Sequence, residues 1–292
     1  VIEGHTAEHA YAGRAQARDE QFRLLLEAEA AHQHLAGEAW IVGAGPGDAG
    51  LITVRGRQLL ARADVVLYDR LVDRHVLEYA RRDAEFISVG KTAGKKSTPQ
   101  HEINALLVRL VKEGKHVCRL KGGDPMVFAR LADEITALQA AGLHYQIVPG
   151  VSAIAGCAAY AGIPLTWREV SQSLLMTTGH ARVGGEVDLG ANPTQRTVAV
   201  YMAGARHAET ATRLIELGHA SDTPVAIVEN GTLPNQRITR TTLQRLADPK
   251  ADIEIGSPAL LIVGAVVAEA RELEWFQPEI APSDSPVEAG LV

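Results

Sequence analysis

The sequence predicts an α/β protein with two α/β domains, and three observations carry this prediction. Short apolar runs alternate with helical patterns from residue 38 onward. The strand-like runs of the first half are continuously apolar, which is typical of a parallel sheet covered on both faces. Beyond residue 162 strands become more frequent and crossovers fewer, which indicates a mixed sheet. The expected organisation is a helical N-terminal extension (1–37), a mostly parallel domain (38–162), a mixed domain (163–276) and a disordered tail (277–292), with the active-site cleft between the two domains.

The first domain is expected to alternate strands with helices in regular order. Strands are expected at 39–42, 65–68, 86–89, 116–120 and 145–148. Helices are expected from a cap at Thr53 to about 63, and at 74–81, 128–141 and 151–160. Ser97 and Gln100 have the spacing of a capping box with Pro99 between them, so another helix is expected to run to about 113.

The second domain follows a linker over 162–171 that carries Pro164. Strands are expected at 174–178, 197–201, 225–229, 236–239 and 259–263. Helices are expected only near 205–217 and 241–246, so fewer crossover connections are available.

Composition limits the classes of protein that fit. The chain is 46% hydrophobic and 22% charged, as in ordinary globular proteins, and its formal net charge of −6 argues against a nucleic-acid partner. No apolar run approaches the roughly 20 residues that cross a bilayer, and the N-terminus lacks the apolar core of a signal peptide. We therefore expect a cytoplasmic protein with no membrane partner.

The cysteines and histidines predict neither disulfides nor a metal site. Cys118 and Cys157 each lie in an apolar segment, which favours small buried side chains in a reducing compartment. The N-terminal histidines have no cysteine or carboxylate framework around them.

Five loops follow the expected strands of the first domain, at the edge where open α/β sheets bind ligands. They span residues 43–48, 68–71, 90–94, 121–125 and 148–153. The first is dense in glycine and resembles a dinucleotide-binding turn, for which Asp69 lies near the expected acidic position. Pro46 argues against that interpretation because it has no N–H group for a phosphate. The loop at 121–125, with Gly122, Gly123 and Asp124, also argues against it.

These five loops resemble, in this order, those of the tetrapyrrole (precorrin) methyltransferase family. Four further motifs share the resemblance: GIPLT at 162–166, TGH at 178–180, YM at 201–202 and ENGT at 229–232. The resemblance covers about 38–276 and is greatest to the branch that methylates uroporphyrinogen III, either alone or as the C-terminal module of a longer chain. Residues 1–37 resemble the end of the segment that precedes this module.

The resemblance implies a homodimeric enzyme that uses S-adenosylmethionine to methylate two pyrrole carbons of uroporphyrinogen III, giving precorrin-2 and S-adenosylhomocysteine. It implies Asp69 as proton acceptor and Lys91 as proton donor. The implied cofactor contacts are Pro46, Gly122, Gly123, Asp124, Val127, Ser152, Ala153, Met202 and Gly231.

The residue types suit this chemistry. A sulfonium cofactor without phosphate needs exposed backbone, which Gly122 and Gly123 offer, and apolar walls, which Val127 and Met202 offer. The eight carboxylates of uroporphyrinogen need cations; the candidates are Arg70, Lys91, Lys95, Lys96, Arg130 and Arg168, with Lys121 also in a loop. Arg109, Lys112 and Lys115 fit a solvated helix face better.

Plainer roles remain open for the two aspartates. Asp124 can bind cofactor or cap the helix that follows it. Asp69 can act as a base or as a turn residue paired with Arg70; its place directly after a buried strand favours the base.

Two segments depart from the family pattern. Residues 128–134 read FARLADE where the family usually has FGRGGEE, so we expect a less permissive backbone. Residues 166–168 read TWR where the family tends to have THR. Both departures lie where substrate is expected, so they bear on regiospecificity.

Three alternatives stay open. One is a sibling methylase that acts on another precorrin. A second, from a different class, is a nicotinamide-dependent dehydrogenase built on the loop at 43–48. The third is a catalytically silent cofactor-binding module, against which Asp69 and Lys91 argue.

Overall fold

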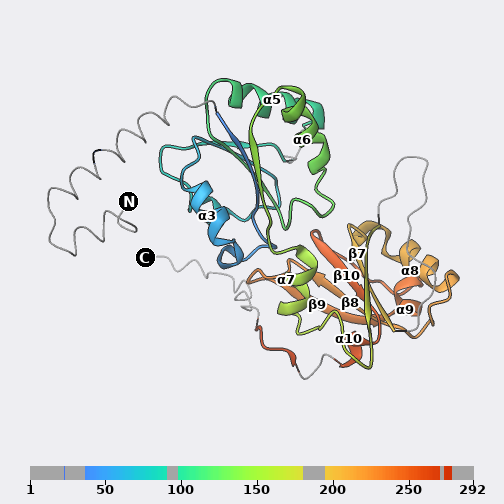
Figure 1. Ribbon diagram of the computed structural model, residues 1–292. Helices are drawn as coiled ribbons and strands as arrows, with labels where there is room; N and C mark the ends of the chain where they lie inside the picture. Colours follow the sequence, from blue (N-terminus) through green and yellow to red (C-terminus); the bar gives the residue numbers. More distant parts are fainter. Residues whose placement is uncertain (1–22, 24–36, 91–97, 180–194, 270–272, 278–292) are drawn as a thin grey trace, which may run out of the picture.

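Two five-stranded sheets organise the chain. The computed structural model describes Arg23 and residues 37–90, 98–179, 195–269 and 273–277 of the 292-residue sequence. The strand orders are β3-β2-β4-β1-β5 and β6-β7-β10-β8-β9. The first sheet, with α3, α5 and α6, lies above the second, with α7 to α10, in the view of Figure 1. The expected α/β class with two sheets is confirmed.

The first sheet is parallel throughout. Its strands are β1 (Ala39–Gly43), β2 (Val65–Tyr68), β3 (Glu85–Ser88), β4 (Val117–Lys121) and β5 (Tyr145–Val148). Each neighbouring pair runs in the same direction. All loops that follow these strands therefore leave from one edge of the sheet.

Helices cover both faces of the first sheet. α5 (Gln100–Lys112) and α6 (Leu131–Ala140) pack against one side, where Ile41 and Leu67 are buried. α3 (Val54–Leu60) and α4 (Arg74–Leu77) pack against the other, where Val42 and Val66 are buried. A short 3₁₀ turn, η1 (Ala49–Leu51), precedes α3. Burial on both faces explains the continuously apolar strands.

The second sheet is mixed, as expected. Its strands are β6 (Ser173–Thr178), β7 (Arg196–Tyr201), β8 (Pro224–Glu229), β9 (Arg237–Thr242) and β10 (Ala259–Val263). Only β6 and β7 pair in parallel; β10 is antiparallel to β7 and β8, and β9 to β8. α8 (His207–Glu216), which follows the turn η2 (Gly204–Arg206), and α9 (Leu243–Ala247) cover one face.

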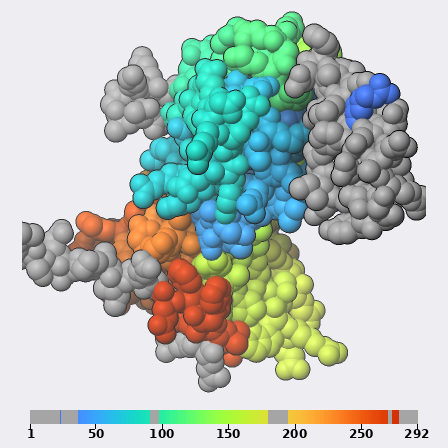
Figure 2. Space-filling model, turned by 90° about the vertical axis from the view of Figure 1, so that its left-hand side faces the viewer, coloured from blue at the N-terminus to red at the C-terminus, as the bar shows by residue number. Residues whose placement is uncertain are grey.

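The other face of the second sheet is covered by α10 (Val266–Glu269) and, unexpectedly, by α7 (Ala153–Tyr160). The segment of α7 was expected to close the first domain, but its buried Ile154, Cys157 and Ala158 pack with the strands of the second sheet. Small side chains allow this close packing: a Cβ on Gly156 would lie 2.3 Å from Pro46 Cγ, in the first unit. Figure 2 shows the blue atoms of the first unit resting on the yellow-green atoms that follow β5.

α7 and α8 each begin two residues later than expected. Three further helix starts differ for reasons that the structure shows. α6 begins at Leu131, not at residue 128, because Phe128 and Arg130 have φ values of 50° and 54°, which a right-handed helix excludes. Pro99, not Ser97, is the N-cap of α5, and the Gln100 side chain is bonded to Asn104 and Glu134. α9 begins at Leu243 because β9 continues to Thr242.

Three further expectations concern the two ends of the chain, the two cysteines and the lack of a membrane-spanning helix. Except for Arg23 and Gly37, the N-terminal extension lies outside the described residues, as does the tail after Gln277. Cys118 and Cys157 are free and buried, and burial raises the pKa of each thiol to about 12, which confirms their expected role as small buried side chains. None of the helices in the described segments is long and apolar enough to cross a bilayer.

Candidate active site

The loops after β1 and β4 are joined by their backbones at the carboxyl edge of the first sheet. Gly45 N donates to Gly123 O over 3.2 Å, and Gly123 N donates to Gly45 O over 2.7 Å. Both glycines have positive φ, 82° and 67°, which other residues adopt at a cost. Pro46 is thereby placed directly beside the loop that carries Gly122 and Gly123.

The first loop is poorly suited to hold a phosphate. Ala44 N donates to Lys121 O, Gly45 N to Gly123 O and Asp48 N to Thr232 Oγ1, so these amides already have protein acceptors. Pro46 has no N–H group to offer. A phosphate cradle needs several free amides pointing at the anion, and this loop lacks them. The geometry therefore argues against the dehydrogenase alternative.

Asp124 joins the fourth loop to the fifth. Its Oδ1 accepts from Met126 N over 2.7 Å, and its Oδ2 accepts from Gly150 N over 2.9 Å. It does not cap α6, whose N-cap is Arg130, so that expectation is wrong. These bonds hold the fifth loop, with Ser152 and Ala153, next to Gly123; a Cβ on Gly123 would lie 3.4 Å from Ala153 N.

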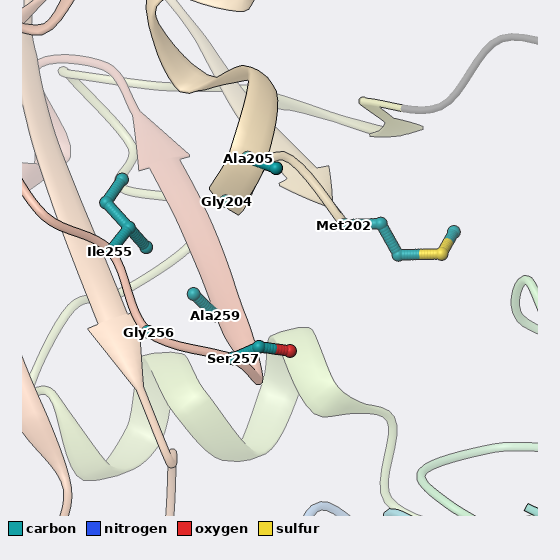
Figure 3. A pocket seen from close by; sticks show the side chains of 7 residues that line it. All are labelled: Met202, Gly204, Ala205, Ile255, Gly256, Ser257 and Ala259. Carbon is teal, nitrogen blue, oxygen red and sulfur yellow. The ribbon is translucent and has the colours of Figure 1, made fainter. Parts of the chain in front are cut away.

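A pocket of about 210 Å³ opens beside Met202 in the second unit. Met202 is 47% exposed and has a φ of 57°, and its side chain extends away from the loop that follows β7 (Figure 3). The other lining residues are Gly204, Ala205, Ile255, Gly256, Ser257 and Ala259. Its side chains are mostly small, so polar backbone groups supply the larger part of its surface, which suits an uncharged organic group with polar atoms and not a cluster of charges.

The end of β7 also contacts the first unit. Tyr201 Oη accepts a hydrogen bond from Ile154 N, near the start of α7, over 3.1 Å. The Tyr201 ring lies 4.9 Å from the ring of Phe128, centroid to centroid. Six expected cofactor contacts lie in the three loops that these bonds join: Pro46, Gly122, Gly123, Asp124, Ser152 and Ala153. Met202 directly follows Tyr201, and Gly231 is joined to the first loop through Thr232.

Asp69 belongs to an ion-pair network that the sequence did not reveal. Its Oδ1 accepts from Arg119 Nη2 over 2.6 Å, and its Oδ2 lies 3.9 Å from Lys121 Nζ. The partner is therefore Arg119 of β4, not Arg70, which is exposed. The Asp69 side chain is 34% exposed and the Arg119 side chain only 2%, so the carboxylate is the solvent-facing end of the network.

Glu134 of α6 forms the inner end of this network. It is fully buried, and its Oε1 accepts from Arg119 Nε and from Lys121 Nζ, both over 2.9 Å. Lys121 is thus buried and paired and does not line a binding loop as we expected. Burial, and then the charge of Arg119, lower the pKa of Lys121. Two cations and two carboxylates balance, which makes their burial tolerable.

The remaining expected substrate residues are only partly described. Arg70, Arg130 and Arg168 are exposed, and Arg130 is paired with Asp133 over 2.8 Å. Lys91, Lys95 and Lys96 lie outside the described residues. Val127 closes a turn by donating its N–H to Asp124 O over 3.2 Å.

The departure at 128–134 has a structural consequence. Phe128 and Arg130 are left-handed although neither is glycine, while the intervening Ala129 is not. Such a conformation costs a non-glycine residue roughly 1–2 kcal/mol. The strain lies beside the replaced family glycines, in the segment that contacts Tyr201.

Comparison with known proteins identifies the family. The model for tetrapyrrole (corrin/porphyrin) methylases matches residues 39–247, and the chain belongs to this family. The siroheme synthase of Pseudoalteromonas translucida is 44% identical over 279 residues, 94% of this chain and 58% of that protein. Siroheme synthase 1 of Klebsiella pneumoniae is 51% identical over 244 residues, 82% of this chain and 51% of that protein. The chain thus spans between half and three fifths of the length of these relatives.

Solved structures show the same fold. Native uroporphyrin III C-methyl transferase from Thermus thermophilus is 38% identical with a TM-score of 0.70; the match covers 80% of this chain and 100% of that one. The complex of that enzyme with S-adenyl homocysteine matches with 37% identity and a TM-score of 0.70, over 83% of this chain and 99% of that one. A cobalt precorrin-4 methyltransferase matches with 29% identity and a TM-score of 0.67, over 81% and 97%.

Proposed function

We propose that this chain methylates two pyrrole carbons of uroporphyrinogen III with S-adenosylmethionine, giving precorrin-2 and S-adenosylhomocysteine. The observation that carries the proposal is the site that joins the two units, in a chain that matches the whole length of a uroporphyrin III C-methyl transferase. A related structure with S-adenyl homocysteine bound supports the choice of donor.

The described residues fit such a donor. Gly122 and Gly123 offer a surface with little side chain, and the pocket beside Met202 offers small side chains with exposed backbone groups. We assign cofactor contacts to Pro46, Gly122, Gly123, Asp124, Val127, Ser152, Ala153, Met202 and Gly231. When bound, the donor supplies an electrophilic methyl group on a sulfonium. The protein's part is to hold the attacking carbon in line with that methyl group, since orientation accounts for much of the rate of such reactions.

We propose Asp69 as the base. As the new C–C bond forms and the C–S bond breaks, the electron pair of that bond returns to sulfur and the pyrrole ring must lose a proton. The exposed edge of the Asp69 carboxylate can accept it, while Arg119 holds the other edge in place. Lys91 is the proposed donor, and Arg70, Lys95, Lys96, Arg130 and Arg168 the proposed partners of the substrate carboxylates.

The experiment is a substrate panel with methyl-labelled donor. Uroporphyrinogen III, precorrin-2 and a later precorrin are each incubated with the purified chain, and the label in the tetrapyrrole is counted. Label in uroporphyrinogen III alone, or in it most rapidly, is the expected result. Label only in a later precorrin would instead support the sibling methylase, which the likeness to the cobalt precorrin-4 enzyme keeps as second candidate.

Two further parts of the proposal concern the oligomeric state of the protein and its location in the cell. We propose a homodimer in the cytoplasm. Light scattering on the purified chain checks the first, because a monomer mass at micromolar concentration would contradict it.

A further inference from the structure

Four residues from three segments form a closed set of hydrogen bonds where the two units meet. We name Asp48, Tyr160, Thr232 and Gln236 the junction ring. Tyr160 Oη donates to Asp48 Oδ2 over 2.6 Å, and Asp48 N donates to Thr232 Oγ1 over 2.9 Å. Thr232 N donates to Gln236 Oε1 over 2.7 Å, and Gln236 Nε2 donates to Tyr160 O over 3.1 Å.

The junction ring is partly buried, and its tyrosine hydroxyl stays protonated. Thr232 and Gln236 are only 3% and 4% exposed. The Tyr160 ring lies 5.0 Å from that of Trp275 and 4.7 Å from that of Phe276. Burial, and then the bond to the Asp48 carboxylate, raise the pKa of Tyr160 to about 12. The Tyr160 hydroxyl therefore remains a donor throughout the physiological range.

The backbone of Thr232 is strained, which indicates that the hydrogen bonds of the junction ring keep the loop after β8 in its conformation. Thr232 has a φ of 69°, and Asn230, two residues earlier, has a φ of 48°. A β-branched residue in this region is a clear outlier, and such strain persists only where the surroundings over-determine it. Both Thr232 N and Thr232 Oγ1 are used by the ring, which supplies that determination.

Asp48 and Thr232 lie within two residues of a proposed cofactor contact, and Tyr160 shares a helix with two others. Pro46 precedes Asp48 by two residues, Gly231 immediately precedes Thr232, and Ser152 and Ala153 begin the helix that ends at Tyr160. The packing leaves little slack: a Cβ on Gly231 would lie 2.2 Å from Cys157 Sγ, and one on Gly47 would lie 2.8 Å from Thr232 Oγ1. A shift of one loop therefore moves the others.

We propose that Tyr160, Thr232 and Gln236 are positioning residues for the methyl donor. Acting through Asp48, they fix the Pro46 loop of the first unit against the Gly231 loop of the second, so that both meet the same ligand. The inference rests on the proposed function and deepens it, because it names what holds the two halves of the cofactor site together.

Calorimetric titration of the full chain with S-adenosylhomocysteine tests the inference. Tyr160→Phe removes one hydroxyl and keeps the ring stacking. We expect the Kd to rise about tenfold, the equivalent of about 1.4 kcal/mol. KM for the donor should rise likewise and KM for the tetrapyrrole stay within twofold. Tyr145→Phe is the matched control, since its hydroxyl accepts only from Gln139 on the outer side of the first sheet.

A second pair of variants separates the effect of the ring's hydrogen bonds on binding from a general loss of protein stability. Thr232→Val keeps the β-branched shape but loses the acceptor for Asp48 N, whereas Thr232→Ser keeps it. We expect the valine variant to bind S-adenosylhomocysteine about tenfold more weakly and the serine variant to bind within threefold of wild type.

The outcomes are distinguishable. If Tyr160→Phe and Thr232→Val lower Tm but bind S-adenosylhomocysteine as the wild type does, the ring is merely structural and the inference is wrong. If the wild type itself does not bind S-adenosylhomocysteine, the proposed function fails first.

Discussion

At the scale of single residues, the proposed chemistry depends on how Asp69 is held. Arg119 presents its guanidinium to Asp69 from within the sheet, and Glu134 fixes the other end of the same guanidinium. One carboxylate oxygen is therefore anchored by Arg119, while the other lies 3.9 Å from Lys121 Nζ and the side chain stays 34% exposed. This arrangement is what a fixed base beside a flat macrocycle requires.

Replacing the base should abolish turnover and spare binding. Asp69→Asn keeps an acceptor for Arg119, so the network should persist. We expect kcat to fall by about 10²–10⁴, the usual contribution of a positioned base, with the Kd for S-adenosylhomocysteine within twofold. Asp83→Asn, at a solvent-exposed ion pair, is the control and should leave both unchanged. Full turnover by Asp69→Asn would remove this residue from the mechanism.

The buried part of the network makes a stability prediction. Glu134→Leu would leave Arg119 and Lys121 with Asp69 as their one remaining carboxylate, and breaking a buried pair this way costs about 3–5 kcal/mol. We expect a large drop in the free energy of unfolding, measured by urea denaturation. A loss below about 1 kcal/mol would mean that water reaches the two cations.

At the scale of elements, the sequence predicted the strands well and the helix starts less well. β2, β5 and β10 have the expected bounds because their apolar runs end at polar or turn residues. α6 starts late because Phe128 and Arg130 take left-handed conformations beside Tyr201, a contact between segments far apart in the chain. Local patterns carry no information about such contacts.

The same limit applies to the site. The glycine and proline positions stand out in the sequence because close backbone approach leaves a local signature, and their role as cofactor contacts stays a proposal. The bond from Asp69 to Arg119 joins residues 50 apart and was missed. One feature of the sequence indicates this bond. Arg119 and Lys121 are cations at alternate positions, and therefore on the same face, of an otherwise apolar strand.

The start of α6 gives a prediction of its own. Arg130 has a φ of 54°, so Arg130→Gly should be more stable than Arg130→Ala by about 1 kcal/mol, because glycine alone adopts that φ freely. Both variants lose the pairing with Asp133 equally. Thermal unfolding of the two proteins side by side measures the difference. Equal Tm values would show that the left-handed conformation at 130 is not maintained in solution.

At the scale of the whole molecule, the proposal assigns the two sheets different halves of one cofactor site. The parallel sheet gathers its loops at one edge, and the mixed sheet supplies Met202, Gly231 and the pocket between 202 and 259. α7 is continuous in sequence with the first unit yet packs on the second. The helix and the junction ring thus make the relative placement of the two units part of the cofactor site.

The most direct test of the account is the mass of the product formed from uroporphyrinogen III. The purified chain is incubated anaerobically with uroporphyrinogen III and excess S-adenosylmethionine. The tetrapyrrole product is then oxidised, and its mass is measured by mass spectrometry. We predict the addition of two methyl groups, with Asp69→Asn as the inactive control. Recovery of unmethylated uroporphyrin from the wild type, under conditions where it binds S-adenosylhomocysteine, would contradict the central claim.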